Sequence, residues 1–148
     1  MSTVHASCVL IGEAGILIRG PSGSGKSRLA CDLLAEAAAR GRFARLVGDD
    51  RIALQPHGSR LVARGVAAIA GLVEMRGIGL VPAPHETAAV VRLLVECEPA
   101  RRDRLPPDEP ATVLLGVALP TMRLHVEGGS ARPVLARLAA FESAGTVP

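Results

Sequence analysis

Gly20-Pro-Ser-Gly-Ser-Gly-Lys-Ser27 is the most informative motif in this 148-residue chain. It matches the pattern G-x-x-x-x-G-K-[ST], in which small residues let successive backbone N–H groups wrap a diphosphate. A helix that starts at Lys26 or Ser27 would favour the same negative charge at its N-terminus. The pattern therefore predicts a nucleotide-binding loop, with Lys26 on the β/γ-phosphates and the Ser27 hydroxyl on Mg²⁺. The predicted phosphate-contacting residues are Gly20, Pro21, Ser22, Gly23, Ser24, Gly25, Lys26 and Ser27.

The sequence on both sides of the loop has the expected context. An apolar run over 15–19 predicts the strand that delivers the loop, and 7–11 predicts its hairpin partner. After the loop, apolar residues recur at helical spacing from Ser27 to about Arg40, and Gly41 is a plausible stop. A strand–loop–helix order makes an accidental match of the glycine pattern a poor explanation.

The rest of the chain alternates short apolar runs with turn residues. We expect strands over 43–48, 88–95, 113–117 and 122–126, a second hairpin joining 51–54 to 60–63, and a closing helix over 131–141. The apolar run 66–73 suits either a short helix or a buried strand. Hairpins beside a phosphate loop predict one α/β domain over residues 1–148, with a mixed sheet.

Composition narrows the possible partners. The net charge is only +3, and Phe43 and Phe141 are the only aromatic residues, so we expect no nucleic-acid partner. The core must then be built from aliphatic side chains. The three cysteines have no metal-ligand spacing, and no apolar run reaches membrane-span length, so we expect no membrane partner and a cytoplasmic location.

Acidic and histidine residues provide further candidates for the site. Asp49-Asp50 follows a predicted strand, where phosphoryl transfer needs a carboxylate to hold Mg²⁺ or to accept a proton. Without the loop upstream, the pair would be interpreted as a turn or a helix cap. The histidines at 5, 57, 85 and 125 are each expected at the surface or as satisfied polar groups.

Residue chemistry alone does not decide the role of two further segments. Glu74 precedes a Gly-x-Gly turn whose glycines, Gly77 and Gly79, suggest a close backbone approach, and a surface ion pair is the default interpretation for the glutamate. Arg101, Arg102 and Arg104 form a basic cluster that is either solvated charge or a clamp on a transferring phosphoryl group.

Taken together, these motifs resemble the catalytic domain of the bacterial HPr kinase/phosphorylase family, whose fold is related to phosphoenolpyruvate carboxykinase. His5 before a hairpin, the glycine loop, Leu46-Val-Gly-Asp-Asp50 and Leu72-Val-Glu-Met-Arg-Gly-Ile-Gly-Leu80 match in order. The Glu-x-Arg-Gly-x-Gly stretch is the most discriminating of them. The chain resembles a short, stand-alone form of that domain.

The resemblance implies an ATP- and Mg²⁺-dependent serine kinase acting on an HPr-type phosphocarrier protein of the phosphotransferase system. It implies that Asp50 is the general base, that His5 assists it, and that Arg104 acts from a mobile loop. The implied metal ligands are Ser27 and Glu74, and Asp49 is added to them as the carboxylate that follows the predicted strand. It further implies a homo-oligomer, a hexamer in the family, and a phosphorylase activity associated with a stretch that 119–124 matches only in part.

Two other functions fit the same glycine loop. A small-molecule kinase would carry an arginine-rich lid and a parallel sheet, and the Glu74–Gly79 signature argues against it. A regulatory module that senses ATP would keep Lys26 and Ser27 but has no need for Asp50 and His5, so their presence favours an enzyme.

Overall fold

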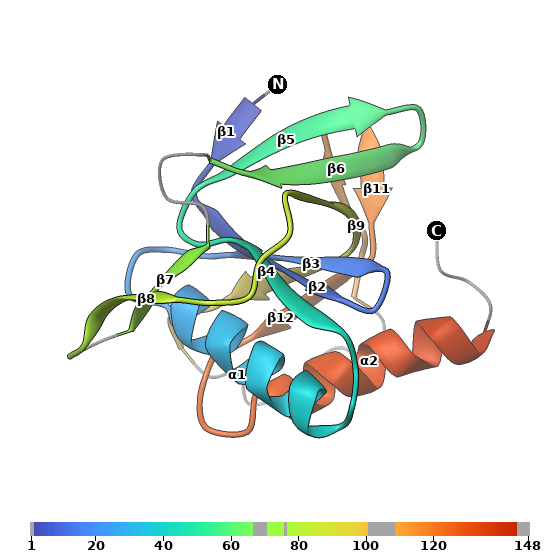
Figure 1. The fold of residues 1–148 in the computed structure, drawn as a ribbon. Helices are drawn as coiled ribbons and strands as arrows, with labels where there is room; N and C mark the ends of the chain where they lie inside the picture. Colours follow the sequence, from blue (N-terminus) through green and yellow to red (C-terminus); the bar gives the residue numbers. More distant parts are fainter. Residues whose placement is uncertain (1, 67–70, 76, 101–108, 145–148) are drawn as a thin grey trace.

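A long central strand, β9, joins the two parts of a curled eight-stranded sheet (Figure 1). The computed structural model describes residues 2–66, 71–75, 77–100 and 109–144. The strands of the large sheet are β1 (Ser2–Val4), β2 (Ala6–Ile11), β3 (Ala14–Arg19), β4 (Ala44–Gly48), β5 (Ile52–His57), β6 (Arg60–Gly65), β9 (Ala88–Cys97) and β12 (Thr121–Leu124). Two separate hairpins, β7 (Leu72–Met75) with β8 (Gly79–Pro82) and β10 (Thr112–Leu114) with β11 (Val117–Leu119), and two helices, α1 (Lys26–Ala39) and α2 (Ala131–Ala144), complete the described elements.

The sheet is mixed, as the hairpins in the sequence predicted. Its order is β1-β5-β6-β9-β3-β2-β4, and β12 also pairs with β9. Strand β9 runs parallel to β3 and to β12, whereas β2 is antiparallel to both β3 and β4. The carboxyl ends of β3, β9 and β12 therefore meet at one edge, which is where ligands bind in open α/β sheets.

Two apolar clusters cover the two faces of the strands around β9. Both helices lie on one face in Figure 1, where Leu29 and Leu33 of α1 and Leu138 of α2 are fully buried. Each fully buried leucine contributes about 1.5–3 kcal/mol. Strands β5 and β6 cover the other face, burying residues such as Leu54 and Leu61. Aliphatic side chains dominate both clusters, which confirms the prediction of a core with almost no aromatic residues.

Most of the predicted elements are confirmed with small changes of boundary. The β2–β3 and β5–β6 hairpins form in antiparallel register, and α1 begins at Lys26. The run 113–117 is not one strand, because Leu115 and Gly116 adopt positive φ values of 49° and 81° and turn the chain into the β10–β11 hairpin. The later strand is 121–124, not 122–126. Leu72 and Val73 lie in β7, so the helical alternative for that end of 66–73 is wrong.

The prediction that another part of the backbone closely approaches the glycines of the β7–β8 hairpin is wrong. Gly77 and Gly79 have φ values of 83° and 102°, and a Cβ added at either would meet nothing within 4 Å. These glycines therefore provide left-handed backbone conformations for a tight turn, and no other part of the described chain approaches them closely. The hairpin carries Ile78 and Leu80, which are 71% and 62% exposed.

Candidate phosphate-binding and catalytic site

The glycine loop joins the carboxyl end of β3 to the first turn of α1. Gly25 is the N-cap residue with φ 97°, and no side chain caps the helix. The first turn of α1 also contains no acidic residue. Backbone N–H groups at such a helix start have no intrahelical partner, so they remain available to an anion. This geometry supports the predicted role of the loop.

Glycine is required at position 25 for two physical reasons. Its φ of 97° is rare for residues with a side chain, and an added Cβ would lie 2.8 Å from Cβ of Val126. Val126 follows β12 and is 8% exposed. The close approach of the loop to this segment therefore depends on the absence of a side chain.

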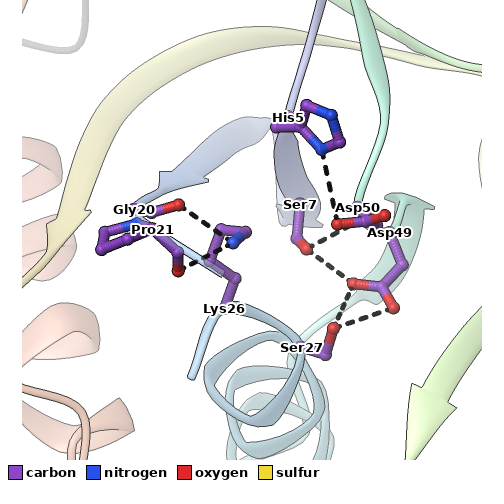
Figure 2. A network of polar contacts seen from close by, with 8 residues as sticks. All are labelled: His5, Ser7, Gly20, Pro21, Lys26, Ser27, Asp49 and Asp50. Atoms are coloured by element: carbon purple, nitrogen blue, oxygen red, sulfur yellow. Dashed lines mark hydrogen bonds and ion pairs between the residues drawn. The ribbon is translucent and has the colours of Figure 1, made fainter. Parts of the chain in front are cut away.

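Lys26 is folded back onto its own loop. Its Nζ donates hydrogen bonds to the carbonyl oxygens of Gly20 at 3.0 Å and Pro21 at 3.2 Å, as Figure 2 shows. The residue is 8% exposed and is the only lysine in the chain. These two neutral carbonyls leave the ammonium charge unneutralised, which is the state that favours capture of a phosphate group.

Asp49 connects four segments of the chain through its carboxylate. It accepts a hydrogen bond from Ser7 Oγ on β2 at 2.6 Å and from Ser27 Oγ on α1 at 2.8 and 3.0 Å (Figure 2). The backbone N–H of Glu74 on β7 donates to Oδ2 of Asp49 at 2.9 Å, whereas Ser7 donates to Oδ1. Asp49 is only 4% exposed. The structure thus brings Ser27, Asp49 and the backbone of Glu74 together, while the Glu74 side chain lines the adjoining cleft.

The donors near Asp49 fit a magnesium ion that also binds phosphate oxygens. In the described part of the chain Asp49 forms no salt bridge, and a buried carboxylate without a counter-ion is costly. Among the same described residues, no three His, Cys, Asp or Glu side chains converge on one point. Mg²⁺ in kinases is held by one or two carboxylates together with substrate phosphates, so this oxygen-donor set is sufficient.

Asp50 differs from its neighbour in exposure and partners. Its side chain is 63% exposed and lines the cleft, and its backbone has φ 65°, an uncommon value for a residue other than glycine. Nδ1 of His5 lies 3.8 Å from Oδ1 of Asp50, and the histidine side chain is 76% exposed. His5 and Asp50, two of the four predicted catalytic residues, therefore lie side by side and exposed to solvent (Figure 2).

A β-bulge at the end of β4 sets the positions of both aspartates. Val9 pairs with Leu46 and Cys8 pairs with Gly48, so Val47 is an extra residue in the ladder. Such bulges bend a strand and re-aim the side chains that follow it. The bulge comes directly before the aspartates, and no local sequence pattern predicted it.

A cleft of about 1120 Å³ opens over the glycine loop. Its lining includes residues 21–28, Asp50 and Glu74, and also His125, which follows β12. His125 was expected at the surface or as a satisfied polar group, and its Nδ1 does lie 3.0 Å from the carbonyl oxygen of Glu98. Its position in the cleft was not predicted. The sequence offered no cue for this position, because the predicted strand 122–126 contains His125, whereas β12 ends at Leu124 and leaves His125 at the edge shared with the glycine loop.

Cysteine chemistry does not contribute a nucleophile here. Cys31 lines the cleft, and burial, followed by the negative charges of Asp49 and Asp32, raises the pKa of its thiol. Burial raises the pKa of Cys97 to about 11 and that of Cys8 to about 12. Since the thiolate is the reactive form, these three thiols are poor nucleophiles at neutral pH. Arg104, the fourth predicted catalytic residue, lies outside the described residues, as do Arg101 and Arg102.

Neither helix in the described part of the chain has the length and apolar content that a membrane crossing requires.

Comparison with known proteins identifies relatives of the whole domain. Among curated proteins, the HPr kinase/phosphorylase of Chlorobium phaeobacteroides (strain BS1) is 32% identical over 149 residues, covering 93% of this chain and 42% of the relative. The HPr kinase/phosphorylase of Treponema pallidum (strain Nichols) is 31% identical over 151 residues, covering 93% and 46%. The chain thus spans less than half the length of these curated relatives.

A solved structure and a family match agree with that result. The HPr(Ser) kinase/phosphatase from Coxiella burnetii has a TM-score of 0.73 and 25% identity, over 98% of this chain and 94% of that one. The likeness supports the α/β fold with a mixed sheet that the sequence predicted. The HPr Serine kinase C-terminal domain matches residues 1–144, nearly the entire sequence. This chain belongs to the HPr serine kinase C-terminal domain family.

Proposed function

We propose that this chain transfers the γ-phosphoryl group of ATP to a serine hydroxyl of an HPr-type phosphocarrier protein. One observation carries the proposal: the uncapped start of α1, Ser27 and Asp50 line the same cleft, and Asp49 and His5 contact Ser27 and Asp50, respectively. The name that the relatives share, HPr kinase/phosphorylase, supports the choice of ATP and of HPr.

The phosphate-binding half of the mechanism rests on positive charge. The uncapped N–H groups of α1 and the ammonium of Lys26 would neutralise the phosphate oxygens, whose charge is spread over three positions in the transition state. Ser27, Asp49 and Glu74 would hold Mg²⁺, which offsets charge on the same oxygens when bound. Arg104 is our candidate for a further positive charge on the transferring group.

The proton-accepting half rests on Asp50. The hydroxyl of the target serine would attack phosphorus, the bond to the bridging oxygen of ADP would break, and the hydroxyl proton would pass to the Asp50 carboxylate. His5, 3.8 Å from that carboxylate, would assist it. Asp49 is less suited to this role, because its oxygens already accept hydrogen bonds and only 4% of the residue is exposed.

Family resemblance supports two further parts of the proposal. We propose that the protein is cytoplasmic and that it assembles as a homo-oligomer, with the hexamer as the expected form. Light scattering of the purified protein tests the assembly.

A transfer assay tests the proposed activity. The protein is incubated with ATP carrying a labelled γ-phosphate, Mg²⁺ and HPr, with an HPr variant that lacks the target serine as the control. We expect label on HPr and none on the control. Label on a small metabolite instead would favour a small-molecule kinase, and ATP binding without transfer to any acceptor would favour a sensor. Incubation of phosphorylated HPr with inorganic phosphate tests the phosphorylase direction.

A further inference from the structure

Ser7 is a buried hydroxyl that contacts both aspartates. It lies on β2 and is 0% exposed. Its Oγ donates a hydrogen bond to Oδ1 of Asp49 at 2.6 Å and accepts one from the backbone N–H of Asp50 at 3.3 Å (Figure 2). One side chain thus fixes an oxygen of one aspartate and the backbone of the next.

The surroundings of Ser7 indicate that the hydroxyl has a specific role. Neighbouring residues Ala6, Cys8 and Val9 are fully buried and apolar in their packing. Burying a hydroxyl without a hydrogen-bond partner is unfavourable, so a serine at this point of a core strand is tolerated only because it is paired. Alternation along the strand directs Ser7 to the same face as Val9, which packs in the cluster with α1, whereas Cys8 packs in the opposite cluster.

The backbone at Asp50 is the part of the site that most needs support. Its φ of 65° is in the left-handed region, which residues with side chains rarely adopt. The bulge at Val47 brings the chain to this point, and the Asp50 N–H then finds its acceptor in Ser7. The direction of the Asp50 carboxylate toward the cleft follows from that backbone conformation.

We propose that Ser7 is a positioning residue that holds Asp49 against Ser27 and aims Asp50 at the acceptor hydroxyl. This inference rests on the proposed kinase function for its effect on rate, but the geometric part stands without it. Small errors in the placement of a reacting group lower the rate steeply, so one hydroxyl away from the reacting atoms is enough to affect catalysis.

The test compares Ser7→Ala with Cys8→Ala in the full chain. Each substitution removes one heavy atom from adjacent, fully buried positions of β2, but only Ser7 contacts the aspartates. Two quantities are measured for each protein: hydrogen exchange of the Asp50 amide by NMR, and kcat and KM for ATP with HPr as acceptor.

We expect Ser7→Ala to speed exchange of the Asp50 amide by about 5- to 10-fold, the loss of one hydrogen bond. We also expect kcat to fall by about 10-fold or more while KM for ATP stays within about twofold. Cys8→Ala should leave exchange at Asp50 and kcat near the values of the unsubstituted protein.

Two results would overturn the inference: an Asp50 amide that exchanges equally in both variants, or a kcat that falls equally in both. If the unsubstituted protein transfers no phosphate to HPr, the proposed function fails, yet the amide measurement still decides whether Ser7 positions Asp50.

Discussion

Replacing each aspartate of Asp49-Asp50 by asparagine should separate a structural effect from a catalytic one. Asp49 accepts hydrogen bonds on both oxygens, from Ser7 on one and from the Glu74 N–H on the other. Asparagine presents only one oxygen, and its NH₂ group must face one of these donors. Leaving one buried donor unsatisfied costs about 1–3 kcal/mol.

That cost gives a measurable change in melting temperature for Asp49→Asn. A domain of this size loses about 3 °C per kcal/mol, so the midpoint should fall by roughly 3–9 °C. Asp50→Asn has a different expectation, because the side chain is 63% exposed and its ion-pair partner in the described part of the chain, His5, is 76% exposed. Surface changes of this kind alter stability by less than about 0.5 kcal/mol, and asparagine also tolerates the left-handed backbone at this position.

Although Asp50→Asn should change stability little, we expect it to change the rate of phosphoryl transfer strongly. Asp50→Asn should keep nucleotide binding and lose about 100- to 10,000-fold in phosphoryl transfer, the usual contribution of a general base. Calorimetry gives the melting temperatures, and a fluorescent ATP analogue gives nucleotide affinity without interference, because the chain has no tryptophan or tyrosine. Normal transfer by Asp50→Asn, or full stability of Asp49→Asn, would refute the division of roles between the two residues.

Three further changes test the loop and the cleft. Lys26→Ala should weaken ATP binding by about 10- to 100-fold, since it removes a charged donor to the phosphates, and an unchanged affinity in equilibrium titration would contradict the loop assignment. Gly25→Ala should destabilise the protein by about 1–3 kcal/mol more than Gly23→Ala. A Cβ added at Gly25 would lie 2.8 Å from Val126, whereas a Cβ added at Gly23 would meet nothing within 4 Å in the described part of the chain. Equal melting temperatures of the two variants would argue against this packing. Alkylation of Cys31 in the native protein should be slow at neutral pH and accelerate as the pH rises, because the raised pKa keeps the thiol protonated. ATP with Mg²⁺ should slow the reaction further, and rapid or unprotected labelling in mass spectrometry would be the contrary result.

The sequence was most informative where the physical signal is local. Glycine spacing, an apolar strand before it and a helical period after it are properties of neighbouring residues, so the loop and the start of α1 at Lys26 were predictable. The same holds for the β2–β3 and β5–β6 hairpins, whose strands are joined by short turns.

Features that depend on distant residues or on unusual backbone were not predictable. Leu115 adopts a left-handed conformation without being glycine, so a single strand was predicted where the β10–β11 hairpin forms. The bulge at Val47 arises from pairing between β4 and β2, which no short window contains. Ser7 and Asp49 are 42 residues apart, and only the folded sheet shows that the serine belongs to the site.

The proposed kinase activity is best tested by the intact mass of HPr after incubation with this protein, ATP and Mg²⁺, followed by mapping of the modified residue. We expect the gain of one phosphoryl group on a serine of HPr, and none when Asp50→Asn replaces the unsubstituted protein. If HPr stays unmodified in the presence of a protein that demonstrably binds ATP, this cleft is not the active site of an HPr serine kinase.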